Sequence, residues 1–193
     1  GVSRDVVHRV VQCAFESGVR YFDTAPGYGN GRSERLLGEV LSGLPRHEFV
    51  LSTKVGRVLN PVNTSSNTQR GVAPPDLEAL FDYSRDGVLR SLEESLQRLK
   101  LDRVDIALVH DLDEAEEEDP RHWRPGIEEA YPTLHDLRSQ GVVRAIGAGL
   151  NETESCLRFV RDCDADCLIM AGRYTLLDQT GLPELLPLCQ RRG

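Results

Sequence analysis

Lysine is almost absent from this chain. Only Lys54 and Lys100 occur, so arginine supplies 21 of the 23 Lys and Arg side chains. A generic positive charge is therefore usually an arginine here, and a lysine carries information. Its amine is a compact charge that can tune the proton of a neighbour, whereas the guanidinium of arginine is a planar fork. Lys54 directly follows an apolar segment, which makes it a candidate for such a role.

The sequence also lacks an excess of positive charge and any long apolar run. Its formal net charge is −8, which disfavours nucleic acid and anionic membranes as partners, because both attract clustered Lys and Arg. No apolar segment approaches the roughly 20 residues that cross a bilayer, and no signal peptide is recognisable. We therefore predict a cytoplasmic globular protein. The sequence leaves its oligomeric state open.

The cysteines show no pairing pattern. There are five, an odd number, and no two are spaced as Cys-x-x-Cys. Cys163 and Cys167 have no further ligand nearby, so no metal site is predicted. We expect free, mostly buried thiols in a reducing compartment.

Apolar periodicity predicts an alternation of helices and strands. Residues 56–84 show no period and are expected to form a long loop, and the acidic residues 111–119 a solvated loop, with a substrate-facing role as the alternative. The helix at 126–139 would carry an awkward internal Pro132. The expected helices are 3–17 with Ser3 as N-cap, 33–41, 85–99, 126–139, 152–161 and 182–190; the expected strands are 19–22, 49–53, 104–109, 142–147 and 167–170.

This alternation indicates right-handed βαβ units and a parallel sheet. No Gly-x-Gly-x-x-Gly follows any strand, and the glycines at 27–31 have the wrong spacing for a dinucleotide or phosphate loop, which disfavours a doubly wound sheet. We predict an α/β fold, a (β/α)8 TIM barrel that is incomplete in this chain. A complete barrel needs roughly 250 residues. The first strand and the last two strands are missing from the pattern, and residues 1–193 form one partial barrel domain.

Three successive predicted strands end in an ionisable residue. These residues are Asp23, Lys54 and His110, and Tyr28 follows the first of them in a Gly-rich loop. Because strand ends and the following loops share one face of a barrel, the four side chains are expected to converge there. Core packing does not explain them, since Lys and Asp are rarely buried without a partner.

The four residues suggest proton chemistry at a carbonyl group. An ammonium about 4 Å from a phenol stabilises the phenolate by about 4 kcal/mol at an effective dielectric constant near 20, so Lys54 could make Tyr28 a proton donor, or a base in the oxidation direction. Asp23 would hold Lys54 charged and oriented. His110 would bind the substrate oxygen. The alternatives are a structural Asp23–Lys54 ion pair, a strand-end histidine and a tyrosine that only covers the barrel.

The motifs around these residues resemble the aldo-keto reductase family. Residues 21–29 (YFDTAPGYG), with Ser-Glu and Leu-Gly shortly after, resemble the family's signature around its catalytic Asp and Tyr. Residues 52–54 (STK), 102–110 (DRVDIALVH) and 141–147 (GVVRAIG) resemble later blocks in the right order. Residues 81–84, 110–111 and 172–177 are most similar to the branch of sugar dehydrogenases that oxidise aldoses at C1, to which a pyridoxal-oxidising relative also belongs.

The resemblance implies a nicotinamide cofactor, NADP or NAD, and a small carbonyl or sugar substrate. It implies Asp23, Tyr28, Lys54 and His110 as the catalytic set, with Asp23 also near the cofactor and Tyr28 and His110 touching substrate. Many relatives place Ser-Asn after the fifth strand to hold the nicotinamide amide. Here residues 149–151 are Gly-Leu-Asn, so Asn151 would act from a shifted position, and Ala171 replaces the Gln of the sixth strand.

Two further residues, Trp123 and Arg173, are candidates for the substrate mouth, with packing and ion-pair roles as alternatives. The leading functional hypothesis is an aldose dehydrogenase or carbonyl reductase. One alternative of the same family is an aldehyde or pyridoxal reductase or dehydrogenase. Two alternatives come from other classes: a Schiff-base lyase with Lys54 as nucleophile, and a cofactor-sensing regulatory subunit.

Overall fold

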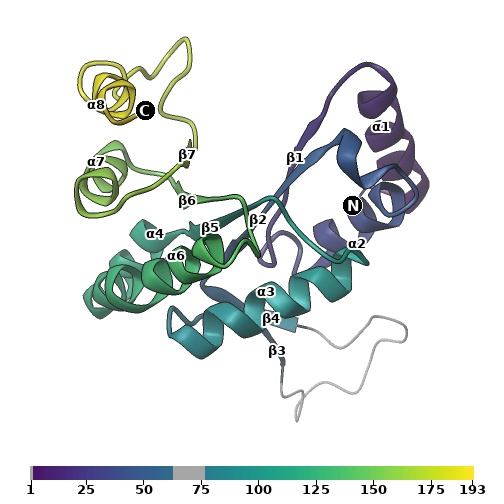
Figure 1. The fold of residues 1–193 in the computed structure, drawn as a ribbon, viewed down its shortest axis with the longest axis horizontal. Coiled ribbons are helices and arrows are strands. Elements are labelled where there is room, and N and C mark those ends of the chain that lie inside the picture. The colour runs from purple at the N-terminus through teal and green to yellow at the C-terminus, as the bar shows by residue number, and fades with distance from the viewer. Residues whose placement is uncertain (1, 63–76) are drawn as a thin grey trace.

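The structure, a computed structural model, describes residues 2–62 and 77–193 and contains one parallel sheet with helices packed against it. The strands β1, β2, β5, β6 and β7 are hydrogen-bonded in this order. The sheet bends between β1, which lies beside α1 and α2, and β7, which lies beside α7 and α8 (Figure 1). The strands are β1 (Tyr21–Asp23), β2 (Val50–Val55), β5 (Ile106–His110), β6 (Ala145–Leu150) and β7 (Cys167–Met170), and β3 (Arg57–Pro61) and β4 (Leu77–Phe81) form a separate antiparallel pair.

The helices occupy the connections between the strands and pack side by side, α1 on α2, α2 on α3, and α7 on α8. Ser3 caps the first helix as predicted, its hydroxyl accepting a bond from the backbone N–H of Val6. The helices are α1 (Arg4–Glu16), α2 (Arg32–Leu41), α3 (Arg85–Leu99), α4 (Leu112–Glu118), α5 (Trp123–Pro125), α6 (Tyr131–Ser139), α7 (Thr153–Asp162) and α8 (Leu185–Arg192), with 3-10 turns at Arg46–Glu48 and Pro120–His122. The predicted succession of parallel strands and helices is confirmed, and the architecture is an incomplete (β/α)8 barrel.

Alternation along each strand separates the core from the site. In β5, Ala107 and Val109 belong to the hydrophobic core beneath the helices, whereas His110 falls on the opposite face. In β2, Leu51 and Val55 are core residues and Lys54 again falls on the opposite face. Because side chains alternate along a strand, the same period that buries the aliphatic residues turns the ionisable ones toward the barrel interior.

The predicted loop over 56–84 is wrong for the part that the structure describes. Arg57–Pro61 and Leu77–Phe81 pair as β3 and β4, with Leu59 opposite Ala79, and residues 63–76 lie outside the described residues. The pairing joins segments far apart in the chain, so no local period reveals it. Val58 and Leu59 are buried, which gives the hairpin its own share of the core.

The acidic residues 111–119 do not form the predicted solvated loop. They fold into α4, in which Leu112 and Ala115 are buried one helical turn apart while most of the acidic side chains stay at the surface. The helix predicted over 126–139 is also different. A π-helical turn, Gly126–Ala130, precedes α6, so Pro132 lies in the first turn of that helix, where proline is tolerated.

Helices α2 and α3 approach so closely that only glycine fits at position 38. A Cβ built there would lie 2.3 Å from the backbone oxygen of Leu99. We expect Gly38→Ala to lower the free energy of unfolding by about 1–3 kcal/mol, because two helices must move apart. Gly43→Ala is the matched control, since its Cβ would meet only ordinary contacts, the nearest atom being 3.5 Å away. Urea denaturation would check the pair, and equal stability of both variants would contradict the expectation.

Candidate active site

The predicted ionisable residues lie together at the carboxyl ends of three adjacent strands. Asp23 is the last residue of β1, Lys54 is the last but one of β2, and His110 is the last of β5. Since β2 pairs with both β1 and β5, the three side chains meet on the inner face of the sheet. Tyr28 comes from the loop after β1.

Lys54 is almost completely buried and is held by two oxygen atoms. Its Nζ donates to Asp23 Oδ2 at 2.5 Å and to the backbone oxygen of Thr24 at 3.0 Å, and only 1% of the residue is exposed. The same ammonium lies 4.5 Å from the ring centroid of Tyr28. Gly149 on β6 makes room for this side chain, since a Cβ there would lie 3.1 Å from Lys54 Cε. The amine is therefore oriented by two oxygen acceptors and lies over the ring of Tyr28.

The second oxygen of Asp23 is also fixed. Ser52 Oγ donates to Asp23 Oδ1 at 2.5 Å and lies 2.9 Å from the hydroxyl of Tyr21. Burial raises the pKa of Tyr21, so that hydroxyl stays neutral at physiological pH. Tyr21 and Ser52 lie two positions before Asp23 and Lys54, and this spacing is the signal by which sequence reasoning could have added them to the site.

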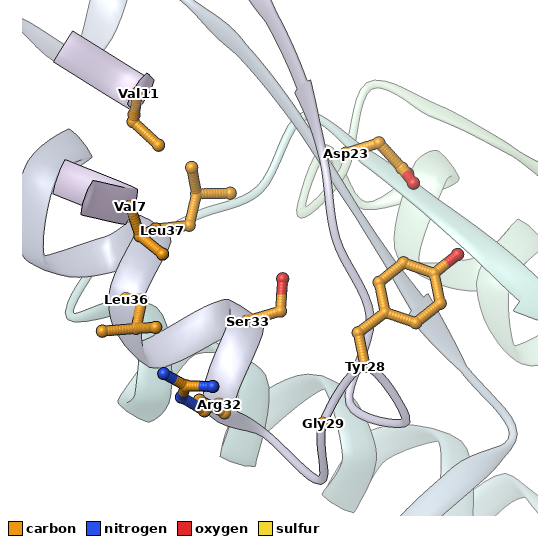
Figure 2. A pocket seen from close by; sticks show the side chains of 9 residues that line it. All are labelled: Val7, Val11, Asp23, Tyr28, Gly29, Arg32, Ser33, Leu36 and Leu37. Carbon is orange, nitrogen blue, oxygen red and sulfur yellow. The ribbon is translucent and has the colours of Figure 1, made fainter. Parts of the chain in front are cut away.

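Tyr28 is half-exposed and stands between Lys54 and His110. Its ring meets that of His110 edge to face, with the centroids 5.5 Å apart. The loop that carries it contains Gly29, Asn30 and Gly31, all with positive φ, a conformation that suits glycine and asparagine. Figure 2 shows the phenol of Tyr28 and the carboxyl of Asp23 directed to the same side, away from α2.

Beside this loop lies a cavity of about 360 Å³ between α1, α2 and the end of β1 (Figure 2). Its walls are mainly apolar on the side of the helices, from Val7, Val11, Leu36 and Leu37, with Asp23, Tyr28, Gly29, Arg32 and Ser33 completing them.

His110 is buried and uncharged. Burial, followed by the charges of Lys54 and Arg57, lowers its pKa to about 3. Its backbone oxygen accepts a bond from the hydroxyl of Tyr83 at 2.6 Å, and burial raises the pKa of that tyrosine. The imidazole Nε2 lies 3.2 Å from Asp111 Oδ2. Nδ1 is buried without a hydrogen-bond partner among residues 2–62 and 77–193.

A small cavity of about 40 Å³ joins these groups to the end of β6. Asn151 borders it, and its amide Nδ2 lies 3.3 Å from a carboxylate oxygen of both Asp111 and Asp113. The amide oxygen of Asn151 accepts no hydrogen bond within the described part of the chain, so it is available to a ligand. The lining residues are Tyr28, Lys54, His110, Asp111, Gly149, Leu150, Asn151, Ile169 and Ala171.

These neighbours fit the amide end of a nicotinamide ring. Gly149 and Ala171 have little or no side chain to occupy the space, and Asn151 offers a neutral acceptor whose donor group is already held by carboxylates. Asn151 is placed by Arg173, which donates to its backbone oxygen at 3.0 Å. The cofactor contact that the sequence analysis assigned to Asn151 stays a prediction.

The two residues predicted at the substrate mouth, Trp123 and Arg173, do not line either cavity beside the catalytic residues. Trp123 is only 5% exposed and belongs to the hydrophobic core, with the guanidinium of Arg158 3.8 Å from its ring centroid. Arg173 pairs with Asp178 and Glu152 and is absent from the lining of the small cavity. Packing of Trp123 and ion pairing of Arg173 are the alternatives considered for these two residues, and their role at the substrate mouth stays a prediction.

Sequence reasoning missed Arg57 and Asp111. Asp111 contacts His110 and pairs with Arg57, whose charge acts on the histidine. Both residues come from the two regions that were predicted to be loops. Within the described residues, no group of three or more His, Cys, Asp or Glu side chains is arranged to hold a metal ion. No helix in residues 2–62 and 77–193 combines the length and the apolar character that crossing a bilayer requires.

In a comparison with known proteins, the family model described as Aldo/keto reductase family matches residues 1–193. The chain is 40% identical to D-threo-aldose 1-dehydrogenase of a Pseudomonas species, over 97% of this chain and 57% of that protein. It is 38% identical to pyridoxal 4-dehydrogenase of Microbacterium luteolum, over 100% of this chain and 60% of that protein. The chain thus spans about three fifths of these relatives.

Solved structures agree with this result. A putative aldo-keto reductase from Pseudomonas aeruginosa superposes with a TM-score of 0.62 and 30% identity, covering 86% of this chain and 55% of that one. The holo form of an aldo-keto reductase from Bacillus halodurans superposes with a TM-score of 0.75 over 100% of this chain and 56% of that one. At 24% identity the second match bears on the fold alone.

Proposed function

The chain belongs to the aldo/keto reductase family, and from this we propose that it forms the catalytic part of an oxidoreductase that moves hydride between a nicotinamide cofactor and a carbonyl group or the C1 of an aldose. The observation that carries the proposal is the convergence of Asp23, Tyr28 and Lys54 with His110 on the inner face of the sheet, with Nζ of Lys54 2.5 Å from Asp23 and 4.5 Å from the ring centroid of Tyr28.

In the reduction direction, Tyr28 gives its hydroxyl proton to the substrate oxygen. The ammonium of Lys54 stabilises the phenolate that remains, and Asp23 keeps the amine in place. His110, uncharged, donates from Nε2 to the same substrate oxygen and polarises the carbonyl. When bound, nicotinamide supplies the hydride that the carbonyl carbon receives. In the oxidation direction the phenolate of Tyr28 takes the hydroxyl proton of the substrate.

The substrate is an aldose or another small aldehyde. Its support is the similarity to D-threo-aldose 1-dehydrogenase and pyridoxal 4-dehydrogenase, whose names describe oxidation at an aldehyde or sugar carbon. The cofactor is NAD or NADP, with Asn151 and Asp23 next to its nicotinamide. Residues 1–193 form part of one barrel domain, and the protein works in the cytoplasm, where its cysteines, all free in the structure, remain reduced.

A Schiff-base lyase fits the site less well. Its nucleophile would be an uncharged amine with access to substrate, whereas Lys54 is 1% exposed and already donates to Asp23 and Thr24. The two functions separate experimentally, because borohydride treatment in the presence of substrate would trap a covalent adduct on the lysine of a lyase.

We expect the full-length protein to change the absorbance of the reduced nicotinamide band when it receives a substrate and a cofactor. Aldoses, pyridoxal and simple aldehydes would be screened with both NAD(H) and NADP(H). An aldose oxidised by one of the two cofactors, with no adduct after borohydride, is the expected result. Absence of any absorbance change together with an adduct at Lys54 would reject the oxidoreductase and support the lyase.

A further inference from the structure

Arg57, at the start of β3, is held by two carboxylates beside the candidate active site. Its Nη2 lies 3.0 Å from Asp111 Oδ2 and 2.8 Å from Glu114 Oε2, and its Nε donates to Asp111 at 3.1 Å. The guanidinium lies over the ring of Phe81 with its carbon 4.0 Å from the centroid. The side chain crosses close to the loop of Tyr28, since a Cβ on Gly27 would lie 3.1 Å from Arg57 Cδ.

Asp111 connects this arginine to the histidine. It has a positive φ of 47° directly after β5, and its Oδ2, the atom that Arg57 contacts, is 3.2 Å from His110 Nε2. Its other oxygen lies 3.3 Å from Nδ2 of Asn151. One carboxylate therefore faces a guanidinium and an imidazole at the same time.

This arrangement poses a chemical conflict. A carboxylate beside an imidazole ordinarily favours the doubly protonated, charged ring. One observation on His110 opposes that form. Its Nδ1 is buried with no partner in the described residues, and a buried N–H without an acceptor is costly. A ring that carries its single proton on Nε2, beside Asp111, with the lone pair on Nδ1, avoids that cost.

We propose that Arg57 and Asp111 are positioning residues for His110: Asp111 selects the Nε2–H form of the imidazole, and Arg57 neutralises Asp111 so that the ring does not take up a second proton. The same Nε2–H is the group that would donate to a substrate oxygen. The consequence for turnover rests on the proposed function, whereas the assignment of proton and charge concerns the protein before substrate binds.

The groups that face His110 from each neighbouring element support this balance. Lys54 on β2 and Arg57 on β3 bear positive charges that disfavour a second proton on the ring. Burial is the largest cause that lowers the pKa of the imidazole, and these two charges lower it further. Tyr28, from the loop after β1, meets the imidazole edge to face with its aromatic ring. Asp111, before α4, is the carboxylate in contact with the ring.

Two more acidic groups are near but already paired. Asp23 binds Lys54, and Glu114 binds Arg57. Removing Arg57 would therefore leave two carboxylates, Asp111 and Glu114, without their cation. We expect such a change to favour the imidazolium form of His110.

The test is a nuclear magnetic resonance titration of protein labelled with nitrogen-15 in histidine, with His110 assigned by the loss of its signals in His110→Gln. In the unchanged protein we expect the Nε2–H form and no protonation of His110 between about pH 5 and pH 8, the range in which ordinary histidines titrate. In Arg57→Met the pKa of His110 should rise from about 3 by about 1–3 pH units, the effect of an unopposed carboxylate at this distance.

Three further variants separate electrostatics from folding. In Arg57→Lys the pKa of His110 should stay close to its value in the unchanged protein, because the positive charge is kept. In Arg57→Met combined with Asp111→Asn the pKa of His110 should also return close to that value. Arg90→Met is the matched control. Arg90 also holds the hairpin, through the backbone oxygen of Leu59 and the side chain of Asn60, but it is not among the charges that act on His110, and its removal should leave the titration unchanged.

The pH dependence of kcat/KM should change together with the pKa of His110. In Arg57→Met the acidic limb of the pH profile of kcat/KM for carbonyl reduction is expected to move up by the same amount, whereas the profile of Arg90→Met stays in place. A proton on Nδ1 of His110, or an unmoved titration in folded Arg57→Met, would overturn the proposal. A protein that shows the expected titrations but turns over no carbonyl would leave this inference standing and reject the proposed function.

Discussion

Replacing Tyr28 by phenylalanine is expected to lower kcat by about 10²–10⁴-fold, the usual contribution of a general acid or base. The change removes the hydroxyl that exchanges a proton with substrate and leaves the ring, which packs edge to face on His110 and lies over the ammonium of Lys54. Neither contact depends on the hydroxyl, so the affinity for cofactor and the stability of the fold should change little.

The measurement is steady-state turnover with the substrate found in the screen, together with a cofactor titration by fluorescence. Tyr131→Phe is the matched control, because its hydroxyl contacts the backbone of Asp164, which precedes β7 at the opposite end of that strand. That variant should keep full turnover. If Tyr28→Phe also kept full turnover, Tyr28 would only cover the barrel, and a regulatory, cofactor-sensing role would become the better explanation.

The catalytic set could be predicted from sequence because each member follows an element with a clear local signal. Asp23, Lys54 and His110 each lie at the end of an apolar strand, and strands are recognised from a few neighbouring residues. Parallel pairing then brings their ends to one face without further information. In the structure Lys54 contacts Asp23 and lies over the ring of Tyr28, and that ring meets His110.

Arg57 and Asp111 could not be predicted in the same way. Arg57 is fixed by a hairpin whose two strands, β3 and β4, lie on either side of residues 63–76, so its partner is not a sequence neighbour. Asp111 directly precedes α4, in which five acidic residues conceal the apolar spacing of Leu112 and Ala115. In both cases a tertiary contact, rather than local periodicity, decides the structure.

The bounds predicted for one strand, which contains glycines, were wrong. The sequence suggested a strand at 142–147, whereas β6 is Ala145–Leu150, three residues later. Glycine usually weakens a strand, but it is also used where backbones approach closely. Gly147 lies so near β7 that a Cβ would come within 1.7 Å of the backbone oxygen of Cys167, and Gly149 makes room for Lys54. Both glycines are thus explained only by their neighbours across the sheet.

Replacing Lys54 by methionine is expected to lower kcat by about 10³-fold. The ammonium lies over the phenol ring, 4.5 Å from its centroid. A charge roughly 4 Å from the phenolate would stabilise it by about 4 kcal/mol at an effective dielectric constant near 20, and each 1.4 kcal/mol corresponds to about a tenfold change in rate. Methionine has a similar length and fits beside Gly149, so the space is filled while the charge is lost. Arginine would be a poor substitute, because its planar fork has a different shape.

The same variant should also lose stability, and this second effect tells a catalytic lysine from a structural one. Without Lys54, the bond from Ser52 is the only one left to the Asp23 carboxylate among the described residues. The uncompensated carboxylate should cost about 1–3 kcal/mol, toward the lower end because its side chain is 26% exposed. The double variant Lys54→Met with Asp23→Asn removes that charge. Urea denaturation should then show recovered stability while kcat remains low. Recovery of both quantities together would mean that the Asp23–Lys54 pair only supports the fold, and the proton chemistry assigned to Tyr28 would need another source of activation.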